Sequence, residues 1–576
     1  SLINLMHTPR PMWDLNLDVA ELGRLIEHYG GPGDYHEPAQ IQLQVRPSSK
    51  RALPLRVQGE LLTKSLAAQF AGEFETFDDK TGFSASFVLT AEGPHELRQI
   101  TGVGLPPMGR LQVTGEFSRA TDTHESIKGS VNLQSEKLGQ LTAEGVWGEQ
   151  WKIGSQLELK FEVDRLSKVS ALLPVSLQGD MPLQAQATVR TDGETLLVTE
   201  LKVKLGRNNI SGEISYSLNE TDSHRQKFDG RLASEYFNLN DLFPKKEKKY
   251  LFGNEEIPLV WADRYDVDLE FATDHLLRRN YEVTDFTLKV NSLNGLVNFQ
   301  LQGISAGGDL EVQLDLDTRV DPPPANYFYD WKHLDLDLLP PQLKGGLDVS
   351  GVLSTQGYLA GVGRSLHEIA GSGNGYLFTE LEKNIKFPRG REEFLATTPL
   401  NIVEQILRGV SPWAERKKYY DIKCGVIGMQ ITDGVGHSAA PPDHTIALKA
   451  KEFEFWAFGD LELSEEMLQL SVRSKPRREG ISPASLLEKS GLSLLYPPYY
   501  GIQGTLLHPV VVPDPEGSSL FESLKLGATW ATGGTSVVVL SLLDQLSDEG
   551  GGCQGARQRS QLFMEKPGGS LSRVRR

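Results

Sequence analysis

Apolar and polar residues alternate with a period of two along most of the chain. Alternation over four to eight residues is typical of a β-strand with one apolar and one solvated face. Turn sequences such as TDG, SLNG and SAGG separate the alternating runs. The runs used below are Leu157, Leu159, Phe161 and Val163; Leu201, Val203 and Leu205; and Leu310, Val312, Leu314 and Leu316. The pattern predicts a mainly β fold of repeating antiparallel hairpins with a few short helices.

Helical patterns are few. Residues 17–30 and 398–410 each space their apolar side chains along one helical face, so we expect an amphipathic helix in each. Helices do not alternate with strands, which argues against doubly wound α/β folds and TIM barrels.

Many one-sided strands without helical cover must bury their apolar faces in some other way. A second sheet, closure into a barrel, or a curled sheet filled by a ligand would each do so. Burying a CH₂ group contributes about 0.8 kcal/mol, so acyl chains would suit a curled sheet. Alternation alone does not separate these three architectures.

Composition narrows the function classes. The formal net charge of -17 argues against nucleic-acid binding, which depends on Lys and Arg neutralising phosphates. Two cysteines in 576 residues exclude a disulfide-dense scaffold and a Cys-rich zinc module. No stretch reaches the roughly 18 to 20 apolar residues that a membrane-spanning helix needs.

Candidate chemistry is sparse. The glycine-rich residues 371–378 lack the order and the lysine of a phosphate-binding loop, so a turn into a strand is the better interpretation. The pairs Asp266 and Asp268, Asp315 and Asp317, and Asp335 and Asp337 lie on polar strand faces, which favours solvation over catalysis or cation binding. The histidines form no metal-ligand set, and no nucleophile elbow occurs. We expect no catalytic, cofactor or metal site.

Cys424 lies in a run that alternates like a strand, and the residues leave four roles open: core residue, nucleophile, metal ligand or half of a disulfide. Ile422, Cys424 and Val426 are expected to share one face. The apolar phase then shifts by one residue, to Met429 and Ile431, which predicts a β-bulge at residues 425–428.

From about residue 105 to Cys553 the order of features resembles the AsmA family of Gram-negative bacteria. The stretches that carry the resemblance are GVGLPPMGRLQVTGEF, LNGLVNFQLQGISAGGDLEVQLDLD, LKGGLDVSGVLSTQGYLAGVGRSLHEIAGSGNGYLF and YYDIKCGVIGMQITDGV. No single motif is specific, whereas their order over more than 400 residues is.

The resemblance implies an elongated, curved β-sheet groove in the periplasm, tethered to the inner membrane by an N-terminal helix not seen in this sequence. It selects the ligand-filled architecture, with the three apolar runs above as groove lining. The implied cargo is phospholipid moving between the inner and outer membranes, with a membrane at each end of the groove. Envelope protein partners are not specified.

Two other functions remain open. A periplasmic scaffold for outer-membrane protein assembly could pair its edge strands with client strands. An enzyme acting on envelope lipid or glycan would rest on the Asp pairs alone.

The resemblance also shapes the expected domains. These are a strand and amphipathic helix over residues 1–40, a repeating β-groove over 41–320, an AsmA-like C-terminal module over 321–550, and a flexible tail over 551–576. The family carries cysteines at about the two positions found here, which implies a disulfide between Cys424 and Cys553 in an oxidising compartment.

Overall fold

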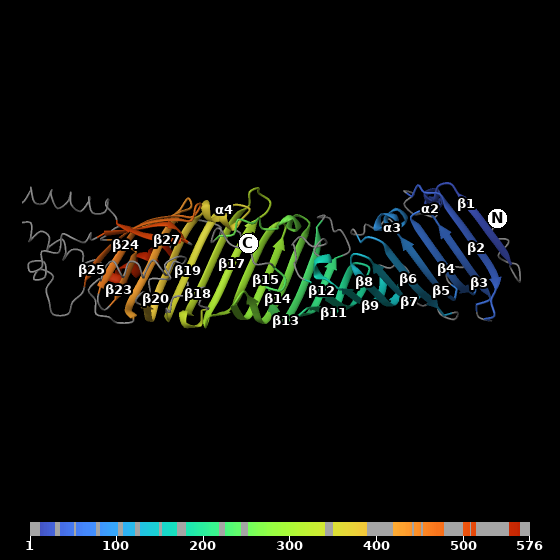
Figure 1. Cartoon of the computed structure of the whole chain (residues 1–576), viewed down its shortest axis with the longest axis horizontal. Helices are drawn as coiled ribbons and strands as arrows, with labels where there is room; N and C mark the ends of the chain where they lie inside the picture. The colour runs from blue at the N-terminus through green and yellow to red at the C-terminus, as the bar shows by residue number, and fades with distance from the viewer. Residues whose placement is uncertain are drawn as a thin grey trace, which may run out of the picture. The chain divides into compact units, whose positions relative to one another are not determined.

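The predicted mainly β fold is confirmed. The computed structural model describes residues 12–28, 35–50, 53–76, 81–101, 108–120, 127–148, 153–169, 180–217, 225–243, 252–339, 350–388, 419–439, 443–450, 453–476, 499–506, 508–513 and 552–564. In these residues 27 strands belong to one sheet, accompanied by a few short helices (Figure 1). Neighbouring strands pair antiparallel, mostly with the next strand along the chain.

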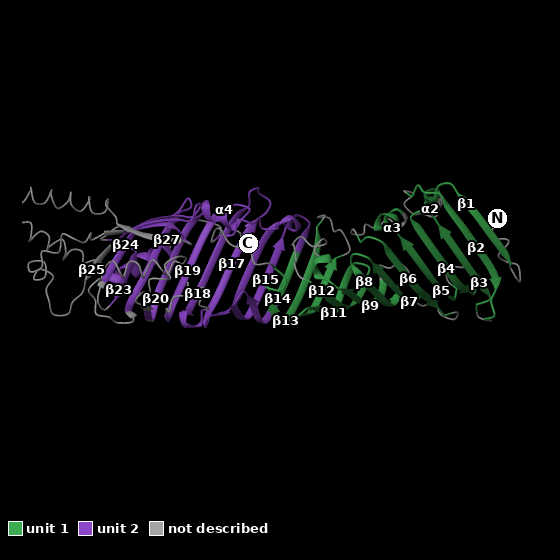
Figure 2. Cartoon of the chain, in the orientation of Figure 1, with its two compact units in different colours: residues 1–245, 267–271 green, residues 246–266, 272–576 purple. Residues whose placement is uncertain are grey.

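The chain divides into two compact units (Figure 2). Unit 1 comprises Ser1–Lys245 and Val267–Phe271, and unit 2 comprises Lys246–Asp266 and Ala272–Arg576. The strand β14 (Tyr265–Arg278) contributes residues to both units.

Unit 1 is a succession of hairpins. Its strands are β1 (Trp13–Val19), β2 (Ala39–Pro47), β3 (Leu55–Leu62), β4 (Leu66–Phe74), β5 (Phe83–Ala91), β6 (Leu111–Arg119), β7 (Ile127–Ser135), β8 (Gly139–Trp147), β9 (Ile153–Val163), β10 (Leu183–Asp192), β11 (Thr195–Leu205), β12 (Asn208–Ser217) and β13 (Gln226–Asn238). The helices in the part of unit 1 that the structure describes are α2 (Leu22–His28), α3 (Pro94–Thr101) and the 3₁₀ turn η1 (Leu166–Lys168).

The expected helix over residues 17–30 is shorter than predicted. Its first residues continue β1, where Leu17 pairs with Ile41 and Val19 pairs with Ala39 of β2. The alternation that begins at Leu15 therefore persists through Val19, and the helix α2 begins at Leu22.

Unit 2 continues the antiparallel pattern. Its strands are β15 (Tyr281–Leu293), β16 (Leu296–Ser305), β17 (Gly308–Asp317), β18 (Pro324–Asp335), β19 (Ser350–Val362), β20 (Asn374–Pro388), β21 (Tyr419–Thr432), β22 (Val435–Ser438), β23 (Ile446–Ala450), β24 (Phe453–Glu462), β25 (Met467–Pro476), β26 (Tyr499–Thr505) and β27 (His508–Pro513). In its described residues the helices are η3 (Val260–Asp263), η4 (Leu336–Leu338), α4 (Leu366–Gly371) and α9 (Gly552–Met564).

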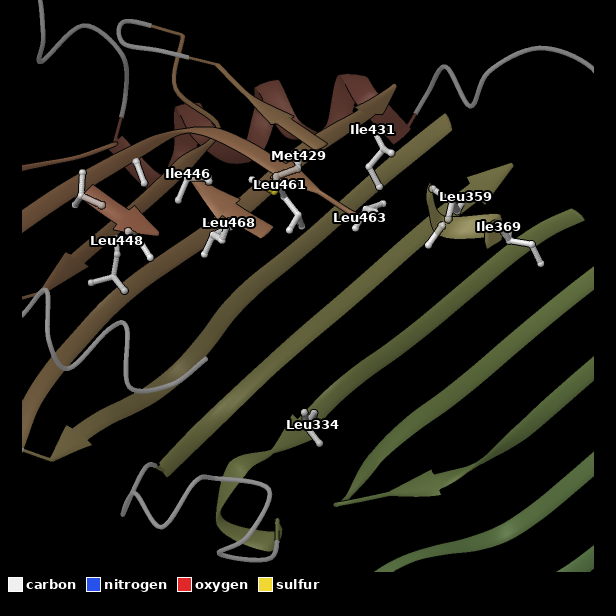
Figure 3. Packing of buried hydrophobic residues seen from close by; sticks show 14 of the residues in the cluster. Leu334, Leu359, Ile369, Met429, Ile431, Ile446, Leu448, Leu461, Leu463 and Leu468 are labelled. Carbon is white, nitrogen blue, oxygen red and sulfur yellow. The ribbon is translucent and has the colours of Figure 1, made fainter. Parts of the chain in front are cut away.

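The main core of unit 2 lies on one face of this sheet. Figure 3 shows its side chains, which come from several strands and from α4, the latter through Ile369. Leu461, Leu463 and Leu468 join Met429 and Ile431 in this cluster. A short segment before β14 adds Ala262, which is fully buried.

The boundary expected at residue 321 is wrong. Asp321 and Pro322, joined by a cis peptide bond, lie in the turn between β17 and β18. The two strands pair with each other, and β18 pairs in turn with β19, so the sheet runs uninterrupted across this turn. Proline and aspartate here mark a tight turn between neighbouring strands.

The flexible tail expected over residues 551–576 is also wrong in part, because α9 occupies Gly552–Met564. Its buried residues, Cys553, Ala556 and Ser560, recur at the three- and four-residue spacing of one helical face. These side chains are small and only weakly apolar, so the face carries little hydrophobic signal in the sequence. The helix expected over residues 398–410 lies outside the described residues.

None of the helices in the described part of the chain combines the length and the hydrophobicity needed to cross a membrane.

Candidate functional site

Strand register divides the sheet of unit 1 into an apolar and a polar face. Residues paired directly across antiparallel strands lie on the same side of a sheet. One such row joins Leu61, Ala68, Leu89, Val113, Leu133, Leu141 and Phe161. The adjacent row joins Glu60, Gln69, Val88, Thr114, Asn132, Thr142 and Lys160. The side that carries the first row is called the apolar face of unit 1.

The structure brings two of the predicted lining sets together on this face. Val163 of β9 and Leu205 of β11 both pair with Leu183 of β10, and Phe161 and Val203 both pair with Ala185. Leu157 and Leu159 share the face with Phe161, as Leu201 does with Val203. Val163 and Leu205 are buried, whereas the other members are half-buried.

The third predicted set lies on one face of the strand β17 in unit 2. Leu310, Val312, Leu314 and Leu316 all belong to β17 and alternate with polar residues. Leu316 is buried in the core, and Leu314 packs against that core from a half-buried position. The set therefore includes one true core residue, and its other members are partly accessible.

One end of the strands in unit 1 is covered by apolar clusters. Leu66, Ala91 and Leu111 pair in one row at this end and pack with Leu22 of α2 and Leu97 of α3. Further along the sheet, Val163, Leu183 and Leu205 pack with residues that include Leu166 of η1. We call this edge of the apolar face the covered rim and the opposite edge the far rim.

Glycines let large side chains lie flat on the apolar face. Phe87 pairs with Gly115, Phe117 pairs with Gly129, and in each case a Cβ added to the glycine would overlap the ring. Phe87 and Phe117 also stack, with ring centroids 6.1 Å apart. In unit 2 the ring of Tyr329 covers a glycine of β19 in the same way. These rings fill the space above a bare backbone, so they project less from the sheet.

A hollow of about 680 Å³ lies on the polar side of unit 1, over β3 to β8. Its lining mixes cationic Arg56 and Lys128 with anionic Glu73, Glu116 and Glu144. Hydrogen bonds from Lys50 and Ser48 hold the pKa of Glu73 below its ordinary value. The mixture offers neither a consistent charge nor an apolar wall, so it does not define a ligand class.

Five of the six residues in the Asp pairs accept hydrogen bonds or form ion pairs with nearby residues of the fold. Asp315 accepts hydrogen bonds from Asn298 and Gln313, and Asp317 accepts them from Arg319. Asp268 is paired with Arg231 at 3.0 Å, Asp266 accepts from the Asn294 backbone N–H, and Asp335 accepts from the Asp337 backbone N–H. Within the described residues, no group of three or more His, Cys, Asp or Glu could hold a metal ion.

A second polar cluster contains the residue types of a catalytic triad but not its arrangement. His333 Nδ1 lies 2.9 Å from Glu382, and Ser354 donates a hydrogen bond to the same carboxylate. Burial opposes the ionisation of Glu382, but these two hydrogen bonds outweigh it and lower its pKa. In a triad the histidine lies between the serine and the carboxylate. Here the carboxylate is central, so the serine has no contact with the histidine that would act as its base in a triad.

Cys424 and Cys553 form a disulfide with a Cα–Cα distance of 6.3 Å. It joins β21 to α9, and residues near it complete the attachment. Arg559 donates two hydrogen bonds to the carbonyl oxygen of His444, at 3.0 and 2.8 Å, and Arg557 pairs with Glu380 at 3.2 Å. The bridge thus fixes α9 against the sheet.

The bulge in β21 lies earlier than predicted. The register shifts between Ile422 and Cys424, so these two residues belong to different clusters, Ile422 to the main core and Cys424 to the cluster under α9. From Cys424 onward the register has no further shift, so Cys424 and Val426 lie on the face under α9 and Met429 lies on the face of the main core. The expectation that Ile422 shares a face with Cys424 is therefore wrong, because the extra residue lies between them.

The surface of the sheet on which α9 packs was not predicted from the sequence. We call this surface the dock of α9. Tyr376, Phe378, Val426, Ala447 and Trp456 form an apolar patch on the side of the sheet opposite the main core. Its signal in the sequence is the uninterrupted apolar run Tyr376, Leu377 and Phe378, which indicates a strand covered on both faces.

No protein-family model matches the chain, and no curated protein matches its sequence.

Proposed function

We propose that the protein is a non-enzymatic lipid-binding protein of the bacterial periplasm that holds phospholipid acyl chains on its apolar sheet face. It would support phospholipid transport between the inner and outer membranes. The observation that carries the proposal is the paired apolar rows of unit 1, which extend from strand to strand with half-buried side chains.

The free-energy argument favours acyl chains as the occupant. Moving two sixteen-carbon chains from an apolar surface into water costs on the order of 20 kcal/mol or more. On a face whose apolar rows continue across many strands, an acyl chain can move from one row to the next without entering water and without that cost. The flat packing of Phe87 and Phe117 on their glycines supports this, because the rings then project little from the sheet and leave room for acyl chains.

The disulfide between Cys424 and Cys553 supports a periplasmic location. Disulfides persist in oxidising environments such as the periplasm and are rare in the reducing cytosol. The net charge of -17 disfavours a tight attachment to anionic membrane surfaces, which suits a protein that must release its cargo.

The test is lipid analysis of the purified full chain. After mixing with phospholipid vesicles and re-isolation, mass spectrometry of the extract should find phospholipid at a fixed molar ratio to protein. Native mass spectrometry should find the same lipid on the folded chain. A protein that emerges without lipid from both measurements would overturn the proposal.

A further inference from the structure

The apolar face of unit 1 carries a charged residue, Arg119, at the last position of β6. Arg119 pairs with Phe83, and Phe117, two residues earlier, pairs with Ala85, so Arg119 lies on the face of Phe83 and Phe117. Among the described strands β1 to β12, every other paired position on this face holds an uncharged residue.

Arg119 lies at the far rim, opposite the covered rim. The first residue of β6, Leu111, is 1% exposed and packs in the cluster beneath α2 and α3. The strand has nine residues, so its two ends are about 26 Å apart at roughly 3.3 Å per residue. The face therefore runs from a buried apolar end to an end that carries a positive charge.

The surroundings of Arg119 on this face are aromatic. Its guanidinium carbon lies 5.9 Å from the centroid of the Phe83 ring, and Phe83 stacks on Phe74 with centroids 6.1 Å apart. All three residues belong to one row across β4, β5 and β6, and all three are half-buried. An arginine stacked on an aromatic ring keeps its planar group oriented, and its N–H donors can bind two oxygens of one phosphate.

We propose that Arg119 binds the phosphate of an anionic phospholipid whose acyl chains lie on the apolar face of unit 1. The inference rests on the proposed function and deepens it by naming the headgroup class. The face matches such an amphiphile along its length: apolar rows receive the chains, and a cation at the far rim receives the phosphate. A zwitterionic headgroup is a poorer match, because its ammonium group is repelled by the guanidinium.

The full chain is mixed with vesicles of equal parts phosphatidylglycerol and phosphatidylethanolamine, re-isolated, and its lipids are quantified by mass spectrometry. We expect the wild-type protein to be enriched several-fold in phosphatidylglycerol. Arg119→Met keeps an unbranched apolar stem and removes the charged group, so total lipid should persist while the enrichment falls to about one. Arg119→Lys keeps the charge without the planar group and should retain part of the enrichment.

Lys128→Met is the matched control. Lys128 belongs to the neighbouring strand β7 and pairs with Ser118, next to Arg119, but it lies on the polar face. Its replacement removes the same charge near the same rim and should leave the enrichment unchanged. Circular dichroism of each variant establishes that the fold is retained.

Three outcomes would overturn the inference. If wild-type protein binds lipid and Arg119→Met has the same headgroup ratio, Arg119 does not select the headgroup, and the proposed function stands. If wild-type protein binds no lipid, both proposals fail. If inorganic phosphate alone gives a calorimetric binding signal that Arg119→Met abolishes, and vesicles do not compete with it, the site belongs to free phosphate.

Discussion

The ring of Phe87 occupies the space that a side chain at Gly115 would need on the neighbouring strand. Gly115 is not in a left-handed conformation, so its backbone would accept other residues, and the ring is what excludes them. Glycine weakens a strand interior because it packs no side chain of its own. The overlying ring covers the backbone that this glycine leaves bare.

Gly115→Ala should therefore destabilise unit 1. Adding a methyl group to a packed surface forces shifts that cost about 1 to 3 kcal/mol, which exceeds the gain of about 0.4 to 1 kcal/mol that alanine brings by restricting the unfolded chain. Urea unfolding measures the change. Gly436→Ala is the control, because its Cβ would meet its nearest atoms at an ordinary 3.6 Å.

A double-mutant cycle separates ring overlap from other effects. If the clash is with Phe87, the Gly115→Ala cost should shrink when Phe87 is also replaced by alanine. An equal cost in both backgrounds would show that the ring does not set the requirement for glycine.

A charge in the middle of the apolar face should block lipid binding without unfolding the chain. Leu159 is half-buried, and both Ala143 and Ala187 pair with it across the sheet, so a glutamate in its place reaches the surface where acyl chains would lie. We expect Leu159→Glu to lose most of the lipid that co-purifies with the wild-type protein, as measured by extraction and mass spectrometry.

Gln186→Glu provides the comparison for Leu159→Glu. It adds the same single charge to an exposed position on the polar face, opposite Lys160 and Lys202. Its lipid content should equal that of the wild type. Equal losses in both variants would mean that added negative charge, and not its position on the apolar face, reduces binding.

Acidification should increase the contribution that Glu380, which lies beside α9, makes to the stability of the folded chain. Burial raises the pKa of Glu380 above its ordinary value of 4.5, Arg557 opposes the rise, and Glu382 adds to it. The unfolded chain thus releases this proton at a lower pH than the folded chain. The contribution of Glu380 to stability is fully present below about pH 4.5 and is lost as pH rises through the folded pKa.

Glu380→Gln should remove this pH dependence. The free energy of unfolding of the variant relative to wild type should therefore increase from pH 4 to pH 7, as measured by urea unfolding at both values. Arg557→Gln should act in the opposite direction, because it removes the cation that stabilises the Glu380 carboxylate. A relative free energy of Glu380→Gln that stays constant across this range would contradict the assignment.

The regular alternation of Leu157, Leu159 and Phe161 was enough to predict strands and to place these residues on one face, because side-chain direction in a strand has a period of two. The position of the bulge in β21 was not predictable to the residue. Ile422, Cys424 and Val426 are all apolar at alternate positions, so their pattern does not reveal the extra residue between the first two.

The candidate site was less accessible to sequence reading than the fold. Arg119 ends a strand whose pattern already stops at Phe117, so only its pairing with Phe83 assigns it to the apolar face. The dock of α9 depends on contacts between residues far apart in the chain, such as Ser560 above Gly428. Alternation describes one strand at a time and does not report which helix covers it.

Replacing Cys424 and Cys553 by serine should release α9. The bridge spans 129 residues, and on the chain-entropy model a loop of that length contributes about 4 to 5 kcal/mol to the stability of the folded state. Ala556 and Ser560 are small, so the face of α9 that they form buries little apolar area. Without the bridge, the helix keeps the packing of Phe563 and Met564 on the cluster and the polar contacts of Arg557 and Arg559. Amide hydrogen exchange in residues 552–564 should therefore accelerate in the double variant and in the reduced wild-type protein, while exchange in β2 to β8 stays unchanged. Wild-type exchange in α9 that is indifferent to reductant, together with two titratable thiols in the native protein, would show that the helix is held without the bridge.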